Sequence, residues 1–212
     1  GYSSPYITPG MWYTFTGNGQ NTTVSTCGQS SFSTRITAFQ GGCLGLECMG
    51  QGNGNCTNSG DKIVIPTALG ETYFILLEGY YEQGTFTISR TCSDAPVGDV
   101  CNTVITLPCD NTLAGSTLQA ANEINVPSCG FNSSPDLWYK ITGNGDISKV
   151  STCTQNNFDT RLYLYSGQCE NLTCLSFNDN FCGEGSQITF ETEPDSTYYI
   201  LVSGNREQGN FS

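Results

Sequence analysis

The two halves of this chain repeat one another at a spacing of about 126 residues. The pair Trp12-Tyr13 recurs as Trp138-Tyr139. Further residues keep the same spacing, namely Ser25-Thr26-Cys27, Cys43, Cys48 and Cys56 in the first half and Ser151-Thr152-Cys153, Cys169, Cys174 and Cys182 in the second. A repeat of this length is a whole domain, so the sequence predicts two like domains in tandem.

The charge balance argues against several classes of partner. Seven basic residues stand against 19 acidic ones, which gives a net charge of −12, and charged residues make up only 12% of the 212-residue chain. Without a basic cluster we expect neither nucleic acid nor an anionic membrane surface as a partner. No apolar run reaches the roughly 18 residues of a membrane span, so we also expect no membrane insertion.

Cysteine usage places the protein outside the cytosol. Twelve cysteines occur without a single histidine and without paired zinc knuckles, so disulfides are the favoured interpretation. The repeat suggests six pairs that use every cysteine, namely Cys27–Cys56, Cys153–Cys182, Cys43–Cys48, Cys169–Cys174, Cys109–Cys129 and Cys92–Cys101. Other pairings stay open, because spacing does not fix connectivity.

Five sequons fit the same extracellular, secreted or cell-surface location. They begin at Asn21, Asn55, Asn132, Asn171 and Asn210. Each matches the acceptor pattern for N-linked glycans. A chain so rich in Asn, Ser and Thr also produces this pattern by chance, so both interpretations stay open.

Short alternating segments between Gly-rich turns predict an all-β protein of two sandwich domains. The expected strands include 11–17, 34–39, 62–65, 72–77 and 84–88, with repeats at 137–143, 160–165, 187–190 and 197–202. We expect domain 1 over residues 1–92, a linker over 93–100 and domain 2 over 101–212. The large aromatics Trp12, Trp138, Phe74 and Tyr199 are expected in the sandwich cores.

The second copy contains a series of motifs in a fixed order, namely Trp138–Ile141, Phe158–Cys169, Asn178–Gly183, Thr197–Val202 and Gly209–Phe211. Together these motifs resemble those of bacterial pre-peptidase C-terminal (PPC) domains. The resemblance covers nearly the whole chain and implies jelly-roll-like β-sandwiches attached to secreted or surface proteins. It implies no catalysis. The first copy departs from the pattern, with Ser33 in place of the aspartate.

The two copies differ in what flanks them. The second is preceded by residues 101–128, which have almost no counterpart before Trp12. The first closes with 86–92, whereas the second stops at 211–212. We therefore expect domain 1 to lack its opening strands and domain 2 most of its closing strand. The chain could be a window of a longer tandem polypeptide, borrow strands from a neighbour, or tolerate unequal strand counts.

Catalytic motifs are weak. Without histidine no Ser-His-Asp or Cys-His arrangement is possible, and we expect no enzyme. Four oxygen-bearing residues could bind Ca²⁺ or simply form a polar turn, namely Asp159, Asn178, Asp179 and Asn180. Arg35 and Arg161 precede apolar strands, where a structural ion pair or hydrogen bond is the preferred interpretation.

These observations lead to a structural hypothesis and an alternative. The first is a subunit of an extracellular glycosylated fibre or surface appendage, built from tandem sandwiches that contact identical subunits or further repeats, with strand complementation as one route. The alternative is a carbohydrate- or matrix-binding accessory module of a secreted hydrolase. For that role Tyr6, Tyr80 and Tyr81 are the candidate sugar-stacking residues.

Overall fold

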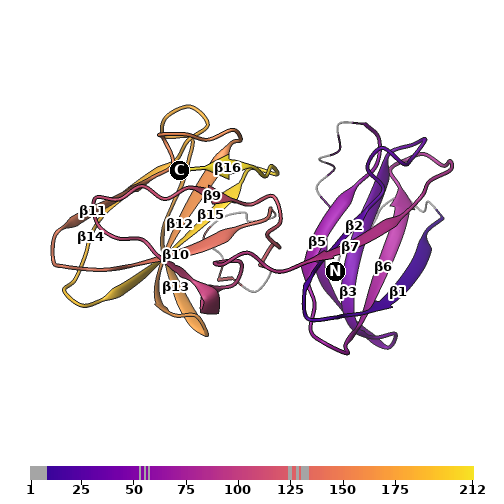
Figure 1. The fold of residues 1–212 in the computed structure, drawn as a ribbon, viewed down its shortest axis with the longest axis horizontal. Coiled ribbons are helices and arrows are strands. Elements are labelled where there is room, and N and C mark those ends of the chain that lie inside the picture. Colours follow the sequence, from indigo (N-terminus) through magenta and orange to yellow (C-terminus); the bar gives the residue numbers. More distant parts are fainter. Residues whose placement is uncertain are drawn as a thin grey trace. The chain divides into compact units, whose positions relative to one another are not determined.

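The computed structural model describes residues 9–52, 54, 56, 58–123, 126, 127, 129 and 134–212, and these residues form an all-β protein (Figure 1). The chain divides into two compact units, Gly1–Asp94 and Ala95–Ser212. The single helical element among the described residues is a 3-10 turn, η1 (Cys101–Thr103). The predicted all-β class is confirmed.

Unit 1 is a sandwich of two sheets. Its strands are β1 (Met11–Thr16), β2 (Asn21–Ser25), β3 (Thr34–Gly42), β4 (Gly45–Gln51), β5 (Lys62–Pro66), β6 (Thr72–Gly79) and β7 (Ser89–Ser93). One sheet has the order β1-β6-β3-β4 and the other β5-β2-β7. Alternate residues of β3, such as Ile36 and Ala38, are buried against Val24 and Ile65 of the other sheet. Burial of every second side chain explains why these segments form strands.

Unit 2 repeats this plan with additional strands. They are β8 (Ile105–Thr106), β9 (Gly115–Ser116), β10 (Leu137–Thr142), β11 (Ile147–Ser151), β12 (Thr160–Gln168), β13 (Asn171–Asp179), β14 (Gln187–Glu191), β15 (Thr197–Gly204) and β16 (Asn210–Phe211). The large sheet has the order β13-β12-β15-β10-β8, and the pairs β11-β14 and β16-β9 lie in smaller sheets. Leu162 and Ile200 of the large sheet share one core with Ile188 of β14 and Phe211 of β16.

The sequence repeat is also a repeat of strand register. Trp12 pairs with Leu76 in unit 1, and Trp138 pairs with Leu201 in unit 2. The β3–β4 and β12–β13 hairpins each shift register at the same place, after Ala38 in one unit and after Leu164 in the other. Corresponding residues therefore occupy corresponding positions in the two sheets.

Buried threonines explain one of the repeated motifs. The hydroxyls of Thr26 and Thr34 lie 2.6 Å apart in unit 1, and those of Thr152 and Thr160 lie 2.6 Å apart in unit 2. Thr26 also accepts a hydrogen bond from the backbone N–H of Asp61, just before β5, at 2.9 Å. Thr152 accepts one in the same way from Ser186, just before β14, at 3.0 Å. Because buried hydroxyls need partners, these pairs require threonine at both positions.

The repeated Glu-Gln-Gly motif closes a loop in each unit. The carboxylate of Glu82 accepts the backbone N–H of Ser33 at 3.1 Å, and that of Glu207 accepts the N–H of Asp159 at 3.0 Å. The glycine of each motif lies so close to a phenylalanine ring that a Cβ atom would clash with it. The motif is therefore structural.

Two features of the organisation differ from the expected ones. The stretch 93–100, expected as a linker, is divided between the units, because β7 extends to Ser93 and the boundary between the units follows Asp94. Inside unit 2 the carbonyl of Gly98 accepts the N–H of Trp138 at 2.7 Å, and the buried carboxylate of Asp99 accepts the N–H of Ala121 at 2.6 Å. The strand expected at 84–88 forms only a bridge at Phe86, and the closing strand is β7.

Candidate functional site: an uncovered sheet face and an open groove

The outer face of the four-stranded sheet in unit 1 is apolar and exposed. Trp12 on β1 has 52% of its surface exposed, whereas its counterpart in unit 2, Trp138, has 0%. Trp12 lies beside Phe39 of β3, and Trp138 lies beside Tyr165 of β12, with ring centroids 5.5 Å apart in both units. In each sheet one strand separates the two strands that carry the rings. The same aromatic pair therefore meets solvent in unit 1 and a covering layer in unit 2.

The covering layer of unit 2 comes from residues before β10. We call residues 98–129, of which 98–123, 126, 127 and 129 are described, the leading segment. Its strand β8 pairs in parallel with β10, with Ile105 opposite Tyr139. The carboxylate of Glu123 accepts a hydrogen bond from the indole N–H of Trp138. Cys101 packs with Trp138 in a buried cluster of its own, separate from the sandwich core.

Two disulfides fasten this segment to the β12–β13 hairpin. Cys101 is bonded to Cys169, and Cys129 is bonded to Cys174. The tyrosine hydroxyl of Tyr165 also donates a hydrogen bond to the carbonyl of Pro127 at 3.3 Å. The outer face of unit 2 is therefore sealed by covalent bonds and polar contacts.

Burial beneath this layer shifts the pKa of two ionisable side chains. Burial raises the pKa of Glu123 above its ordinary value of 4.5, although the indole hydrogen bond from Trp138 acts in the opposite direction. Burial likewise raises the pKa of Tyr163 to about 12. Both shifts follow from the cost of placing a charge away from water.

The corresponding sheet face of unit 1 is not covered by a described segment equivalent to residues 98–129. Among the described strands β1 pairs with β6 alone, so its other edge has no partner, whereas β10 pairs with both β15 and β8. Cys43 and Cys48, the counterparts of Cys169 and Cys174, form no disulfide with any described residue. Cys43 is exposed and Cys48 half-buried. The face thus carries an apolar ring pair, an unpaired edge and two thiols.

Unit 2 has a different open feature along β11. Strand β2 of unit 1 is central, paired with both β5 and β7, but within the described residues β11 pairs only with β14. The difference shows in Asn21 and its counterpart Ile147, which have 2% and 68% of their surfaces exposed. An apolar residue therefore stands at an open strand edge.

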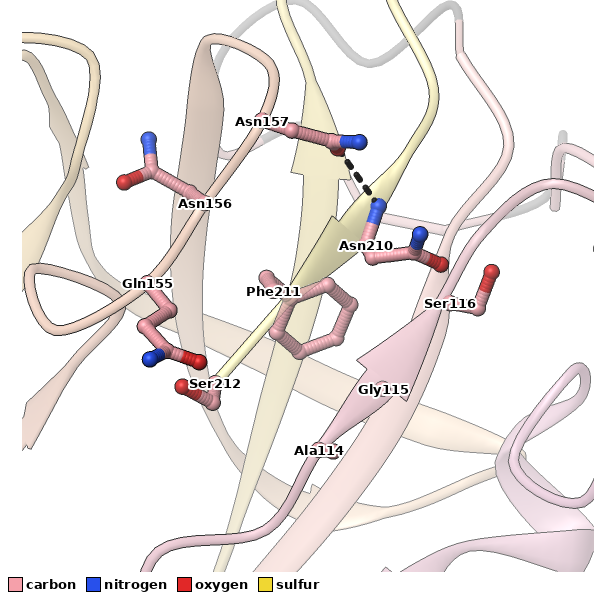
Figure 2. A pocket seen from close by; sticks show the side chains of 9 residues that line it. All are labelled: Ala114, Gly115, Ser116, Gln155, Asn156, Asn157, Asn210, Phe211 and Ser212. Carbon is pink, nitrogen blue, oxygen red and sulfur yellow. Dashed lines mark hydrogen bonds between the residues drawn. The ribbon is translucent and has the colours of Figure 1, made fainter.

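A groove of about 620 Å³ lies elsewhere in unit 2, beside β9 and β16 (Figure 2). It is lined by Ala114–Ser116, Gln155–Asn157 and Asn210–Ser212. The N–H of Ser212 donates to the carbonyl of Gln155 at 2.7 Å, just as Thr87 donates to Gln29 at 2.8 Å in unit 1. In unit 1 the chain continues from Thr87 into β7, so the groove corresponds to the approach to the β7 position.

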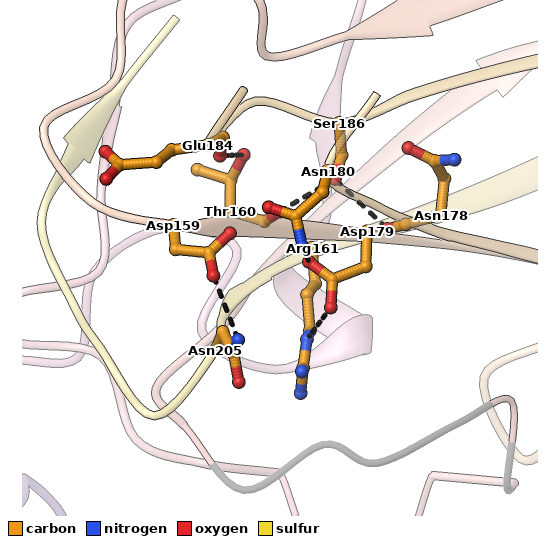
Figure 3. A network of polar contacts seen from close by, with 9 residues as sticks. All are labelled: Asp159, Thr160, Arg161, Asn178, Asp179, Asn180, Glu184, Ser186 and Asn205. Carbon is orange, nitrogen blue, oxygen red and sulfur yellow. Dashed lines mark hydrogen bonds and ion pairs between the residues drawn. The ribbon is translucent and has the colours of Figure 1, made fainter. Parts of the chain in front are cut away.

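The predicted calcium ligands form a hydrogen-bonded network instead of a common cage (Figure 3). Asp179 pairs with the guanidinium of Arg161 at 3.0 Å and accepts a hydrogen bond from the Asn180 side-chain amide at 3.0 Å. Asn178 accepts the N–H of Gln187, and Asp159 accepts the side-chain amide of Asn205 at 2.9 Å.

One oxygen of this network, Asp159 Oδ1, is buried without a partner. Three or more acidic or cysteine side chains gathered for a metal are not found among the described residues. The arginine supplies the positive charge that a cation would have supplied to Asp179. The arrangement favours the polar-turn alternative, and the structural ion pair expected of Arg161 is confirmed.

The disulfide predictions are partly right. Cys27–Cys56 and Cys153–Cys182 are bonded as expected. The other four pairs are wrong, namely Cys43–Cys48, Cys169–Cys174, Cys109–Cys129 and Cys92–Cys101. The reason is the leading segment, which crosses the sheet face and brings cysteines distant in sequence together. Cys43, Cys48, Cys92 and Cys109 carry no disulfide among the described residues.

The glycosylation candidates divide by accessibility. Asn21 is buried at the start of β2, so its amide is inaccessible to a glycan in the folded chain. Asn171 and Asn210 are exposed at the starts of β13 and β16. Asn55 and Asn132 lie outside the described residues.

Sequence reasoning placed Trp12 in a core, which is wrong for the described structure, and it missed the role of residues 98–129 as a cover. A signal was present, since this segment carries three cysteines. None of the helical residues described forms a segment long and apolar enough to cross a membrane.

Comparison with known proteins adds little. No protein-family profile and no curated protein matches the chain. Among solved structures it is similar to an uncharacterised protein from Burkholderia cenocepacia, with 8% sequence identity and a TM-score of 0.32. The alignment covers 95% of this chain and 75% of that one. A likeness at this level carries no argument about family or function, so the resemblance to PPC domains stays a prediction.

Proposed function

We propose that this protein is a structural subunit of an extracellular, glycosylated fibre or surface appendage, in which jelly-roll-like sandwiches complete one another by strand complementation. The observation that carries the proposal is the contrast between Trp12 and Trp138. The same position is 52% exposed in one unit and fully buried in the other. A face of this kind is expected to be covered in the working protein.

The unpaired edge of β1 supports the same function. In unit 2 the corresponding edge of β10 is paired by β8. Open strand edges attract further strands, because their N–H and C=O groups lack partners. Addition of a strand from elsewhere is a recurring mode of protein association. Unit 1 is thus suited to receive a segment that resembles residues 98–107.

The open edge of β11 supports a second contact between subunits, different from the one at β1. Unit 1 suggests its occupant, because Ser89–Ser93 pairs with Asn21–Ser25. Unit 2 is therefore suited to receive a closing strand, whereas unit 1 is suited to receive a leading segment. Contacts between unlike surfaces are head-to-tail, and such contacts generate filaments when they do not close into a ring.

The chemistry of the chain suits a resistant extracellular material. Four disulfides occur among the described residues. Bonds of this type persist in oxidising compartments and restrict the unfolded chain. Asn171 and Asn210 offer exposed acceptors for N-linked glycans.

Electron microscopy of the native material tests the proposal directly. We expect linear assemblies whose axial repeat corresponds to one or two sandwich units. Native material that is monodisperse and monomeric at high concentration, by light scattering and by microscopy, contradicts it.

A pair of matched variants tests the β11 edge. Ile147→Lys places a charge on the exposed edge, which disfavours strand addition. Leu69→Lys makes the same change at an exposed turn of unit 1, between β5 and β6. We expect shorter or fewer assemblies for Ile147→Lys alone. Equal effects of both substitutions would argue against a role of this edge.

A carbohydrate-binding function is the second candidate, and one observation favours it. Tyr80 and Tyr81 are both exposed and lie edge to face, with centroids 4.7 Å apart and the guanidinium of Arg35 at 5.1 Å from the Tyr80 ring. Tyr6 lies outside the described residues. A glycan-array signal lost in Tyr80→Ala, and unaffected by Ile147→Lys, would support this alternative.

A further inference from the structure

The free cysteines of unit 1 match the cysteines of the leading segment in number and in position. Unit 1 has three cysteines without a disulfide among the described residues, Cys43, Cys48 and Cys92. The leading segment also has three, Cys101, Cys109 and Cys129. This correspondence can be examined one pair at a time, because unit 2 contains the bonded equivalents of two of the pairs.

Two of the three pairs follow from the repeat. Cys43 and Cys48 occupy the positions of Cys169 and Cys174, and they lie on the same hairpin in the same register. In unit 2 those positions are bonded to Cys101 and Cys129. A leading segment placed on unit 1 as it lies on unit 2 would therefore bring its first and third cysteines to Cys43 and Cys48.

The third pair follows from strand register. Phe211 lies opposite Gly115 in the antiparallel pair β16–β9, and Phe86 is the unit 1 counterpart of Phe211. Cys92 lies six residues after Phe86, and Cys109 lies six residues before Gly115. An antiparallel ladder continued without a bulge places residues at equal and opposite offsets across from one another. Cys92 would then lie near the second cysteine of the segment, which stands in a turn beside Asp110 (φ 55°), at the end of this stretch.

The surface between these cysteines is complementary to the segment. The exposed ring of Trp12 and its neighbour Phe39 have the arrangement that Trp138 and Tyr165 have beneath the cover. The edge of β1 that no described strand pairs offers Tyr13 at the position where Tyr139 pairs with Ile105. The apolar face, the strand edge and the thiols thus converge on one occupant.

We propose that unit 1 is a docking site for a further segment of the same kind as residues 98–129. Three disulfides hold this segment in place. Cys43 bonds to its first cysteine, Cys92 to its second and Cys48 to its third. The proposal rests on the proposed assembly and names its covalent partner. A second copy of this chain could supply the segment only by giving up its own Cys101–Cys169 and Cys129–Cys174 bonds. The occupant is therefore a leading segment not already used by its own unit.

Each bond requires an oxidant. Two thiols lose two protons and two electrons as the S–S bond forms. With glutathione disulfide, the first thiolate attacks one sulfur and releases one glutathione thiolate. The second thiolate then attacks the mixed disulfide and releases another. Three bonds thus consume three molecules of glutathione disulfide and yield six of reduced glutathione.

The test uses the full chain and an isotope-labelled synthetic peptide with the sequence of residues 98–129. Both are mixed in a glutathione redox buffer, and linked peptides are identified by mass spectrometry. We expect three links, from Cys43 to peptide Cys101, from Cys48 to peptide Cys129 and from Cys92 to peptide Cys109. Each should exceed every other pairing about tenfold or more, because docking raises the local concentration of the matched thiols.

Fluorescence reports the same event independently of sulfur chemistry. The chain has two tryptophans, of which Trp138 is already buried, and the peptide has none. We expect acrylamide quenching of Trp12 to fall when the peptide binds. A peptide of scrambled sequence, with its cysteines at the same positions, is the matched control and should neither protect Trp12 nor link selectively.

Three results would overturn the docking site. They are equal linking by the scrambled peptide, a disulfide between Cys43 and Cys48 in the native protein, and unchanged quenching with the native peptide. Filaments that persist without selective links would overturn the site and leave the assembly standing. Selective links in material that never forms filaments would support the site and count against the proposed assembly.

Discussion

The buried carboxylate of Asp61 accepts the backbone N–H of Ile36 at 2.7 Å. Ser186, a neutral residue, occupies the corresponding position in unit 2. Burial raises the pKa of Asp61 above its ordinary value of 3.8, while hydrogen bonds from backbone groups and the charge of Arg35 act in the opposite direction. Unit 1 thus contains a titrating group that unit 2 lacks at this position.

This difference predicts a pH dependence of stability. A carboxyl whose pKa is higher in the folded than in the unfolded state binds its proton more tightly when folded. Its stabilising contribution is therefore fully present below 3.8 and is lost as the pH rises through the raised pKa. We expect the free energy of unfolding of the wild type, relative to Asp61→Asn, to fall as the pH rises from 3.8 through the raised pKa of Asp61. Denaturant unfolding at several pH values measures this difference, and a flat or rising difference would contradict the assignment.

The two tryptophans predict unequal costs of truncation. Trp138→Ala removes a fully buried indole and leaves the carboxyl of Glu123 without its partner, so we expect a loss of about 3–5 kcal/mol. Trp12→Ala removes a half-exposed ring, and we expect a loss of about 1 kcal/mol or less in the chain alone. Urea unfolding followed by circular dichroism compares the variants. Equal losses would mean that Trp12 is covered in solution.

Paired cysteine substitutions separate bonded from free thiols. Cys27 and Cys56 close a loop with a sequence separation of 29 residues. The double change Cys27→Ala/Cys56→Ala should lower stability by about 3–4 kcal/mol, because the unfolded chain gains freedom. The matched change Cys43→Ala/Cys48→Ala should have an effect within about 0.5 kcal/mol, as is usual for surface substitutions. A large loss in the second variant would indicate a bond between Cys43 and Cys48.

The network around Asp179 predicts little response to calcium. Because the guanidinium of Arg161 already neutralises this carboxylate, addition of Ca²⁺ or of a chelator should leave the melting temperature unchanged. Asp179→Asn should cost about 1 kcal/mol, since the pair is only partly buried. Thermal unfolding with and without the ion checks both statements. A calcium-dependent rise in melting temperature that disappears in Asp179→Asn would restore the metal site.

Accessibility predicts which sequons carry glycan when the chain passes through a eukaryotic secretory pathway. Asn171→Gln should lower the mass of the secreted protein by one glycan, because Asn171 is exposed at the start of β13. Asn21→Gln should leave the glycan content unchanged, because Asn21 is buried. Intact mass before and after deglycosylation provides the measurement. Loss of a glycan in the Asn21 variant would mean that modification precedes folding.

Local patterns predicted what depends on neighbours in sequence and on the repeat. The alternation around Trp12 and Trp138 correctly indicated strands, and the spacing of cysteines correctly indicated Cys27–Cys56 and Cys153–Cys182. Alternating segments favoured an all-β chain, and the cysteine content favoured disulfides. Each of these properties follows from side chains that act within one strand or from residues that the repeat places in register.

Tertiary structure alone decided which surfaces are covered. The path of residues 98–129 across the outer face of unit 2 determines that Cys101 meets Cys169, and no local pattern encodes that path. It also decides that Trp138 is buried and Trp12 exposed, although the two tryptophans share one motif. Burial depends on what packs from elsewhere in the chain, whereas a strand depends chiefly on its own alternation. The sequence therefore predicted the repeat, whereas only the tertiary structure showed which sheet face is covered in each copy.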